Sequence, residues 1–309
     1  MLLLLLLTIA LAYQPDCMNR HRKMEGWYSR LTDDYNSVSV IFGWNKNIST
    51  MSQIVMLVYM FGEEYGVETQ FIDEFNCQTF ANGFEIKSQG FSFRLDGNKT
   101  NINYENKKFL LKIVSYHSVN LETYSIDNYL DRFAAAITAV EWKVFSISSP
   151  SVYEFKTPFQ YHQGKGLTHF EYNTGIFPPG WIWIQVSDSQ MSIVLAMGHI
   201  YGVRVWRGRW NDENISPSKF WTRLTWKLNS SILTVRYFYV GIERFNLEII
   251  PSSQTMELHC PVMSGGFFVG SEQSFNNVAK YQDEYKCMLL KSVALELGGD
   301  YREKRLRRD

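Results

Sequence analysis

The sequence predicts an all-β fold built as two β-barrel or sandwich lobes with few short helices. Apolar and polar residues alternate over many short stretches, whereas the ~3.6-residue periodicity of helices is scarce. Glycine, asparagine and aspartate separate these stretches at spacings of roughly 8–12 residues, as in barrels and sandwiches. A chain of 309 residues can fill one large β domain or two smaller ones.

Five predicted strands lie in the first half of the chain, at residues 37–42, 54–59, 84–87, 91–95 and 109–114. Six more lie in the second half, at residues 181–186, 192–197, 203–206, 223–228, 233–240 and 245–250. Residues 120–139 and 274–297 are the candidates for helices. Gly164–Gly166 is expected to form a hairpin turn.

A polar break at Ser148–Ser151 divides the predicted strands into two groups of similar length. We therefore predict an N-terminal lobe over residues 13–150 and a C-terminal lobe over residues 151–300. Residues 1–12 are interpreted as a signal peptide and residues 301–309 as a basic tail. One continuous sandwich is the alternative to two lobes.

The apolar run Leu2–Ala12 indicates entry into the secretory pathway. It is shorter than the roughly 20 residues that a membrane-spanning helix needs. Ala10 and Ala12 are placed like the small residues before a signal-peptidase site, with an uncleaved anchor as the alternative. No later run is long and apolar enough to span a membrane, so we expect a soluble protein in a lumen or outside the cell.

Sequons and cysteines agree with this location. Asn-x-Ser/Thr sequons lie in polar stretches at Asn47, Asn98, Asn214 and Asn229. The cysteines are Cys17, Cys77, Cys260 and Cys287, and their even number suggests two disulfides. Proximity in sequence favours Cys260–Cys287 and Cys17–Cys77 among the three connectivities.

Composition and motifs exclude several classes of function. The formal net charge is zero, which argues against a nucleic-acid partner, because phosphate binding needs a basic face. There is no C-x-x-C pair, the histidines lack metal-ligand spacing, and no G-x-S-x-G elbow or phosphate-binding loop occurs. We therefore expect no cofactor and no metal. Aromatic residues make up 16% of the chain, which suits walls around an apolar ligand.

Two stretches carry a resemblance to a known family. The first begins Glu25-Gly26-Trp27-Tyr28, and the second extends over Gly164–Gln185 and ends in Trp-Ile-Trp-Ile-Gln. In order and separation they resemble the tocopherol cyclase family, which has an E-G-W-Y strand near its start. Mid-chain that family has a G-x-G-Y-x-E-K-x-W-G, F-P and W-I-W-x-Q pattern. The resemblance covers roughly residues 24–210.

The resemblance implies a calycin-related fold of two lipocalin-like lobes with an apolar cavity. Members of the family close the chromanol ring of vitamin E. An acid protonates the double bond of a prenylated hydroquinone, and the phenol oxygen then captures the carbocation. This chain has Tyr172 where the family has lysine and Thr174 where it has tryptophan, and these departures bear on activity rather than on fold.

Strand alternation assigns the candidate catalytic residues to one face. In an extended strand, His169, Glu171 and Asn173 point to the same side. A carboxyl in an apolar, aromatic site can stay protonated near neutral pH and so protonate an alkene. Glu171 is therefore the candidate acid, with a structural role as the alternative. His169 could position or deprotonate the phenol.

The candidate substrate-binding residues combine indole, phenol and amide groups. They are Trp27, Tyr172, Asn173, Trp181, Trp183 and Gln185. In residues 181–186 the two tryptophans and Gln185 share a face opposite aliphatic side chains, which suits the wall of an apolar ligand site. The alternative is that the tryptophan face packs under a neighbouring lobe.

We predict a tocopherol cyclase-like enzyme that binds a prenyl-quinol or another isoprenoid and cyclises it by acid catalysis. The first alternative is a non-catalytic, secreted lipid-binding protein with a lipocalin-like cavity. The second is a structural ectodomain that uses its β-lobes for protein contacts. An exposed tryptophan face would favour this last function.

Overall fold

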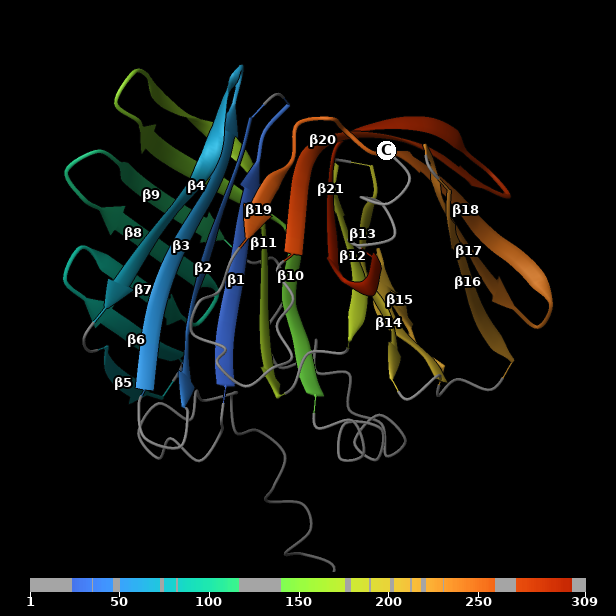
Figure 1. Ribbon diagram of the computed structural model, residues 1–309, viewed down its shortest axis with the longest axis horizontal. Coiled ribbons are helices and arrows are strands. Elements are labelled where there is room, and N and C mark those ends of the chain that lie inside the picture. Colours follow the sequence, from blue (N-terminus) through green and yellow to red (C-terminus); the bar gives the residue numbers. More distant parts are fainter. Residues whose placement is uncertain are drawn as a thin grey trace, which may run out of the picture.

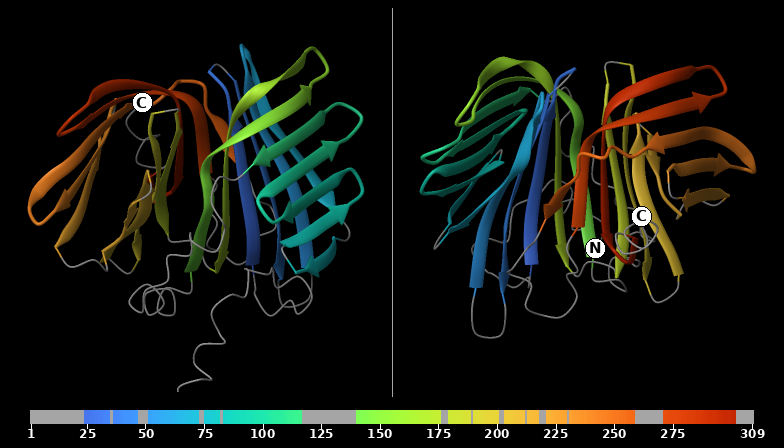
Figure 2. Two further views of the ribbon diagram at one scale, coloured as in Figure 1. Left: turned by 180° about the vertical axis from the view of Figure 1, so that it is seen from behind. Right: turned by 45° about the horizontal axis from the view of Figure 1, so that its top comes forward.

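The computed structural model describes residues 24–34, 36–46, 51–72, 75–81, 83–116, 140–175, 179–188, 190–200, 203–211, 213–217, 221–229, 231–258 and 271–301. These residues form 21 strands in two large antiparallel sheets, each curled around its own interior (Figures 1 and 2). The prediction of an all-β, two-lobe fold is confirmed.

The first lobe is a sheet of 11 strands. Its strands are β1 (Met24–Thr32), β2 (Asn36–Lys46), β3 (Met51–Phe61), β4 (Glu64–Ile72), β5 (Asn76–Phe80), β6 (Gly83–Ser88), β7 (Phe91–Asp96), β8 (Lys99–Glu105), β9 (Leu110–Tyr116), β10 (Val140–Lys156) and β11 (Tyr161–Gly175). Their order in the sheet is β4-β3-β2-β1-β11-β10-β9-β8-β7-β6-β5.

The second lobe is a sheet of 10 strands. Its strands are β12 (Gly180–Ser187), β13 (Ser192–Ile200), β14 (Val203–Trp210), β15 (Glu213–Ile215), β16 (Thr222–Leu228), β17 (Leu233–Tyr239), β18 (Ile242–Ile250), β19 (Met256–Leu258), β20 (Ser271–Asp283) and β21 (Cys287–Gly299). Their order is β15-β14-β13-β12-β21-β20-β18-β17-β16, and β19 pairs with β20.

The two sheets share one plan. In each, the first strand pairs with the last, β1 with β11 and β12 with β21, and hairpins spread to both sides. These central strands face one another across the junction of the lobes, where β10 and β11 contact β12 (Figures 1 and 2). A side chain on the outer face of β1, β11, β12 or β21 is therefore directed toward the other lobe.

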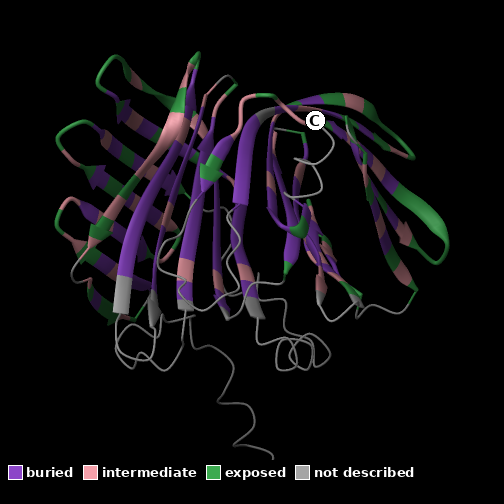
Figure 3. Cartoon of the chain, in the orientation of Figure 1, coloured by how far each residue is buried: buried purple, intermediate pink, exposed green. Residues whose placement is uncertain are grey.

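Three clusters of buried apolar side chains hold the molecule together. One fills the interior of the first lobe, and a second fills the interior of the second lobe. The third lies between the lobes and joins residues such as Tyr28, Met56 and Trp142 to Trp183 and Phe275. Figure 3 shows the buried strands meeting at this junction. Since each such side chain contributes about 1.5–3 kcal/mol on burial, the junction is a core in its own right.

The predicted lobe boundary at residues 150/151 is wrong. Strand β10 continues through Ser148–Ser151, and the division between the sheets falls between Gly175 and Gly180. The serine-rich segment coincides with register shifts between Val144 and Ser149, which mark a β-bulge or irregularity. A bulge can hold the proline and polar residues that resemble a linker in the sequence.

Two smaller predictions are also wrong. Residues 274–297 form most of β20 and β21 instead of a helix. Gly164–Gly166 lies inside β11, not in a turn. A side chain at Gly166 would place its Cβ 2.5 Å from the carbonyl oxygen of Thr32, so close approach of β1 explains this glycine. The segment 120–139, the other helix candidate, lies outside the described residues.

The described residues form no helix that is long and apolar enough to cross a membrane. The predicted signal peptide at residues 1–12 and nearly all of the predicted tail at residues 301–309 lie outside the described residues.

Candidate functional site

The register of β1 and β11 assembles a group of polar side chains on the outer face of the first lobe. Tyr28 is opposite Glu171, and Arg30 is opposite His169. Cross-strand partners point to the same side of a sheet, so these four residues project together toward the second lobe. All four are at least nine-tenths buried.

Strand β12 supplies the facing wall from the second lobe. Trp181 and Trp183 belong to the cluster between the lobes, while Ile182 and Ile184 belong to the interior of the second lobe. The predicted alternation is therefore correct. Both indoles are buried in this cluster between the lobes, and their role in binding a ligand stays a prediction.

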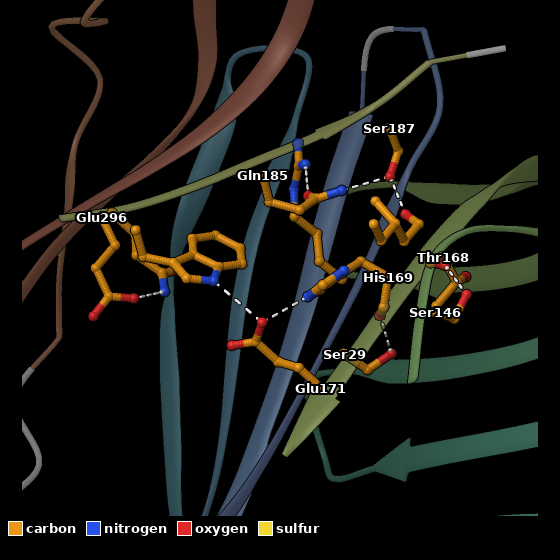
Figure 4. Close-up of polar contacts among 12 residues, drawn as sticks. Ser29, Ser146, Thr168, His169, Glu171, Gln185, Ser187 and Glu296 are labelled. Carbon is orange, nitrogen blue, oxygen red and sulfur yellow. Dashed lines mark hydrogen bonds and ion pairs between the residues drawn. The ribbon is translucent and has the colours of Figure 1, made fainter. Parts of the chain in front are cut away.

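Glu171 is the centre of the cluster. Its Oε2 is hydrogen-bonded to His169 Nε2 at 2.8 Å and accepts a hydrogen bond from Trp183 Nε1 at 3.2 Å (Figure 4). The Tyr28 ring meets the Trp183 ring edge-on, with centroids 5.0 Å apart. His169 Nδ1 is buried and has no hydrogen-bond partner among the described residues. The site thus holds a carboxyl–imidazole pair with one unused ring nitrogen.

A second carboxyl group, on Glu296 of β21, lies on the flank of this cluster (Figure 4). Its Oε1 accepts a hydrogen bond from Trp181 Nε1 at 2.9 Å, and its Oε2 accepts one from Gln273 Nε2 at 2.5 Å. Burial raises the pKa of Glu296, and the charge of Glu171 acts in the same direction. Sequence analysis missed Glu296 because its strand was predicted as a helix.

Arg30 ties the two lobes together. This fully buried side chain donates from Nε to Ser37 Oγ at 2.7 Å, from Nη1 to Gln185 Oε1, and from Nη2 to the Ser292 carbonyl at 2.7 Å. Its guanidinium also lies 5.0 Å from the Phe275 ring centroid. Burial lowers the pKa of Arg30 to about 10.

The Arg30 network continues through Gln185 to the first lobe. Gln185 Nε2 donates to Ser187 Oγ, which in turn donates to the Ile147 carbonyl (Figure 4). On β21, Ser292 has a left-handed backbone with φ of 54°, inside a register shift that turns its carbonyl toward Arg30. The hydrogen bond to Arg30 compensates for part of this strained conformation.

Tyr28 completes the polar lining. Burial raises the pKa of its hydroxyl, nearby Arg30 lowers it, and the charges of Glu296 and Glu171 raise it. Tyr28 and Arg30 were not among the predicted site residues, although alternation along β1 puts them opposite Trp27. The available signal was an arginine close to Trp27, Tyr28 and Leu31, since a charged side chain among such residues needs buried partners.

The predicted site residues do not all meet. Trp27 and Tyr172 pack against each other inside the first lobe, with ring centroids 5.4 Å apart. There Tyr172 Oη donates to Glu25 Oε1 at 2.8 Å. Asn173 lies on the same face as Glu171, half-buried and paired in register with Trp142.

The two departures from the family pattern lie on the opposite face of β11 from Glu171. Tyr172 is a core residue of the first lobe, and alternation gives Thr174 the same orientation. Neither replacement therefore removes a group that adjoins the Glu171 carboxyl.

The cysteines correct one prediction. Cys287 on β21 is free and exposed, so the expected Cys260–Cys287 pair and the count of two disulfides are wrong. Cys77 on β5 is disulfide-bonded. Cys17 and Cys260 lie outside the described residues, so the connectivity of this bond stays a prediction.

The sequons differ in accessibility. Asn98 and Asn229 are exposed at strand ends, whereas Asn214 is half-buried in β15 and Asn47 lies outside the described residues. Within the described strands, no group of three or more His, Cys, Asp or Glu side chains is arranged to hold a metal ion.

Solved structures share this fold. A protein described as ATTH (NE1406) from Nitrosomonas europaea superposes with a TM-score of 0.63 and 12% identity, over 94% of this chain and 97% of that chain. CghA with Sch210972 gives a TM-score of 0.64, and CghA gives 0.65, each with 7% identity over 93% of both chains. At these identities the likeness shows the fold alone. No protein-family model and no curated protein matches the sequence.

Proposed function

We propose that the protein is a cyclase-like enzyme that binds a prenylated aromatic or another isoprenoid between its two lobes. The observation that carries this proposal is the buried Glu171–His169 pair, which is surrounded by Tyr28 and Trp183 at the junction of the sheets. A fold shared with CghA, one structure of which contains Sch210972, agrees with it. The tocopherol cyclase-like motifs supply the reaction class.

The cluster offers the groups that a proton-initiated cyclisation needs. Glu171 and His169 can exchange a proton with a bound molecule, and the unused His169 Nδ1 can contact a hydroxyl. The rings of Tyr28 and Trp183 can stabilise a carbocation through their negatively polarised faces. The overall reaction is an isomerisation, because the proton added to the alkene is balanced by the proton lost from the phenol.

The test is conversion of a phytylated hydroquinone by purified protein, followed by chromatography of the cyclised isomer. Glu171→Gln keeps the size of the side chain but removes the transferable proton. We expect it to lose turnover while still binding the hydroquinone. Glu105→Gln, at an exposed carboxyl on β8, is the matched control and should keep turnover. Equal turnover in wild type and Glu171→Gln would refute the proposed role.

A non-catalytic lipid carrier is the second candidate. It is favoured by the apolar character of the cluster between the lobes, whose side chains could contact a lipid without any chemistry. A carrier would bind the hydroquinone in wild type and return it unchanged. In either case we propose a lumenal or extracellular location, which the exposed Asn98 sequon and the bonded Cys77 support.

A further inference from the structure

One hydrogen bond of the site crosses from the second lobe to the first and ends on the Glu171 carboxyl. Trp183 Nε1 on β12 donates to Glu171 Oε2 on β11 at 3.2 Å. The same oxygen is hydrogen-bonded to His169 Nε2 at 2.8 Å, from within the first lobe. Two groups that come from different lobes therefore hold this carboxyl.

These two hydrogen bonds leave the other Glu171 oxygen for a bound molecule. Both end on Oε2, and no hydrogen bond among the described residues ends on Oε1 (Figure 4). The last torsion of a glutamate side chain is broad when nothing restrains it, so these contacts decide where Oε1 points. The exposed fraction of the Glu171 side chain is 6%, whereas that of His169 is 0%, so Glu171 is the member of the pair that a bound molecule meets first.

The Trp183 indole is itself fixed by rings of the first lobe. Its ring centroid lies 5.0 Å from that of Tyr28 and 5.8 Å from that of His169, and both contacts are edge-on. The side chain is buried in the cluster between the lobes. Packing of this kind restricts the rotamer of the side chain, so the indole N–H is aimed at Glu171 before any molecule binds.

Arg30 fixes the strand that carries Trp183. It donates from Nη1 to Gln185 Oε1, two residues further along β12. Residues two apart on a strand share a face, so Gln185 and Trp183 meet the first lobe together. Arg30 is opposite His169 in the register of β1 and β11. The contact of Arg30 with Gln185 therefore sets the height of Trp183 relative to Glu171.

We propose that Trp183 is a positioning residue, whose indole N–H holds Glu171 Oε2 and thereby directs Oε1 toward the substrate. This inference rests on the proposed function, and it gives Trp183 a role beyond that of a ligand wall. The carboxyl is correctly oriented only while the two lobes are packed together. Since a misplacement of about 1 Å can cost about 100-fold in rate, loss of this hydrogen bond should appear in kcat.

NMR of the full-length protein, with isotopically labelled tryptophan, tests the hydrogen bond without any substrate. The indole N–H signal that disappears in Trp183→Phe belongs to Trp183. We expect this signal to shift in Glu171→Gln, because an amide oxygen replaces the carboxyl oxygen as acceptor. It should stay in place in Glu105→Gln, whose carboxyl is exposed on β8. An unchanged Trp183 signal in Glu171→Gln would overturn the inference.

Kinetics with the phytylated hydroquinone separate positioning from packing. Trp183→Phe keeps an aromatic ring but removes the N–H donor. We expect kcat to fall by about 10- to 100-fold and KM to change by less than about threefold, because most of the ring contact remains. Wild-type kcat in Trp183→Phe would overturn the positioning role.

The matched control is Trp226→Phe. The Trp226 indole is also buried and donates to Tyr301 Oη at 2.9 Å, but it lies inside the second lobe. This variant loses a comparable hydrogen bond and should keep its kcat. An equal fall of kcat in both variants would show a general effect of destabilisation and would refute the inference.

Two further measurements keep the test decisive if Trp183→Phe does not fold. Magnetisation transfer from the Tyr28 ring protons then identifies the Trp183 indole signal, so that wild type can still be compared with Glu171→Gln. Trp183→His retains a ring N–H donor on a smaller side chain and should keep part of the wild-type kcat. A Trp183 signal that is the same in wild type and Glu171→Gln would again refute the inference.

Failure of this inference can be told apart from failure of the proposed function. A wild-type protein that binds the hydroquinone without converting it would refute the proposed function and, with it, the positioning role. Turnover that survives in Trp183→Phe but is lost in Glu171→Gln would support the proposed function and refute the inference alone.

Discussion

Replacing Arg30 by methionine should destabilise the protein more than any surface charge replacement, because Arg30 bonds to both lobes. Methionine retains much of the apolar volume but leaves the acceptors of Ser37, Gln185 and Ser292 without their donor. Each unsatisfied buried acceptor costs about 1–3 kcal/mol. Part of the total cost is offset, because the variant no longer buries a positive charge. We expect the free energy of unfolding to fall by about 3 kcal/mol.

A double-mutant cycle isolates the contact between the lobes. Arg30→Met, Gln185→Leu and the double variant are compared by urea denaturation, with tryptophan fluorescence and circular dichroism as probes. A hydrogen bond to a charged group predicts a coupling energy of about 1.5–3 kcal/mol. Arg94→Met is the control, because Arg94 makes an exposed ion pair with Asp96 worth about 1 kcal/mol or less. Additivity within about 0.5 kcal/mol would refute a direct Arg30–Gln185 bond.

Three other predictions concern the pH dependence, the ligand wall and the surface. Burial raises the pKa of Glu296 above its ordinary value of 4.5, so the folded state keeps a proton that the unfolded chain releases. The free energy of unfolding should therefore fall as the pH rises from 4.5 through the raised pKa of the folded state. Urea midpoints measured against pH should show a smaller fall in Glu296→Gln. Trp183→Ala should weaken binding of a phytylated hydroquinone by about 1–3 kcal/mol in calorimetry, while Trp221→Ala, at an exposed site, should not. Removal of glycans from wild-type protein made in a eukaryotic host should increase its gel mobility, and this shift should be smaller in Asn98→Gln. Equal shifts in wild type and Asn98→Gln would contradict glycosylation at Asn98.

Alternation along single strands was predictable from the sequence. The opposite orientations of Trp183 and Ile184, and the shared face of His169 and Glu171, follow from a period of two and need no tertiary information. What lies across from each face was not predictable. Trp183 faces the other lobe because β12 stands against β11, and local pattern does not encode that pairing.

The missed residues share a physical reason. Glu296 lies in a strand whose register shifts near Ser292, which obscures the period-two pattern. The boundary at Ser148–Ser151 failed similarly, because a bulge tolerates the same serines and proline that a linker contains. Arg30 is buried by partners that are far away in sequence, so its role became evident only from the assembled lobes.

Strand alternation allows one measurement to test whether an apolar molecule binds between the lobes. A prenylated hydroquinone carrying a diazirine is photolysed with the protein, and labelled residues are mapped by peptide mass spectrometry. Binding at the junction predicts labels on Tyr28, Trp183 and Glu296, which face the other lobe. Labels on Trp27 or Ile184, whose side chains fill the lobe interiors, would contradict the claim.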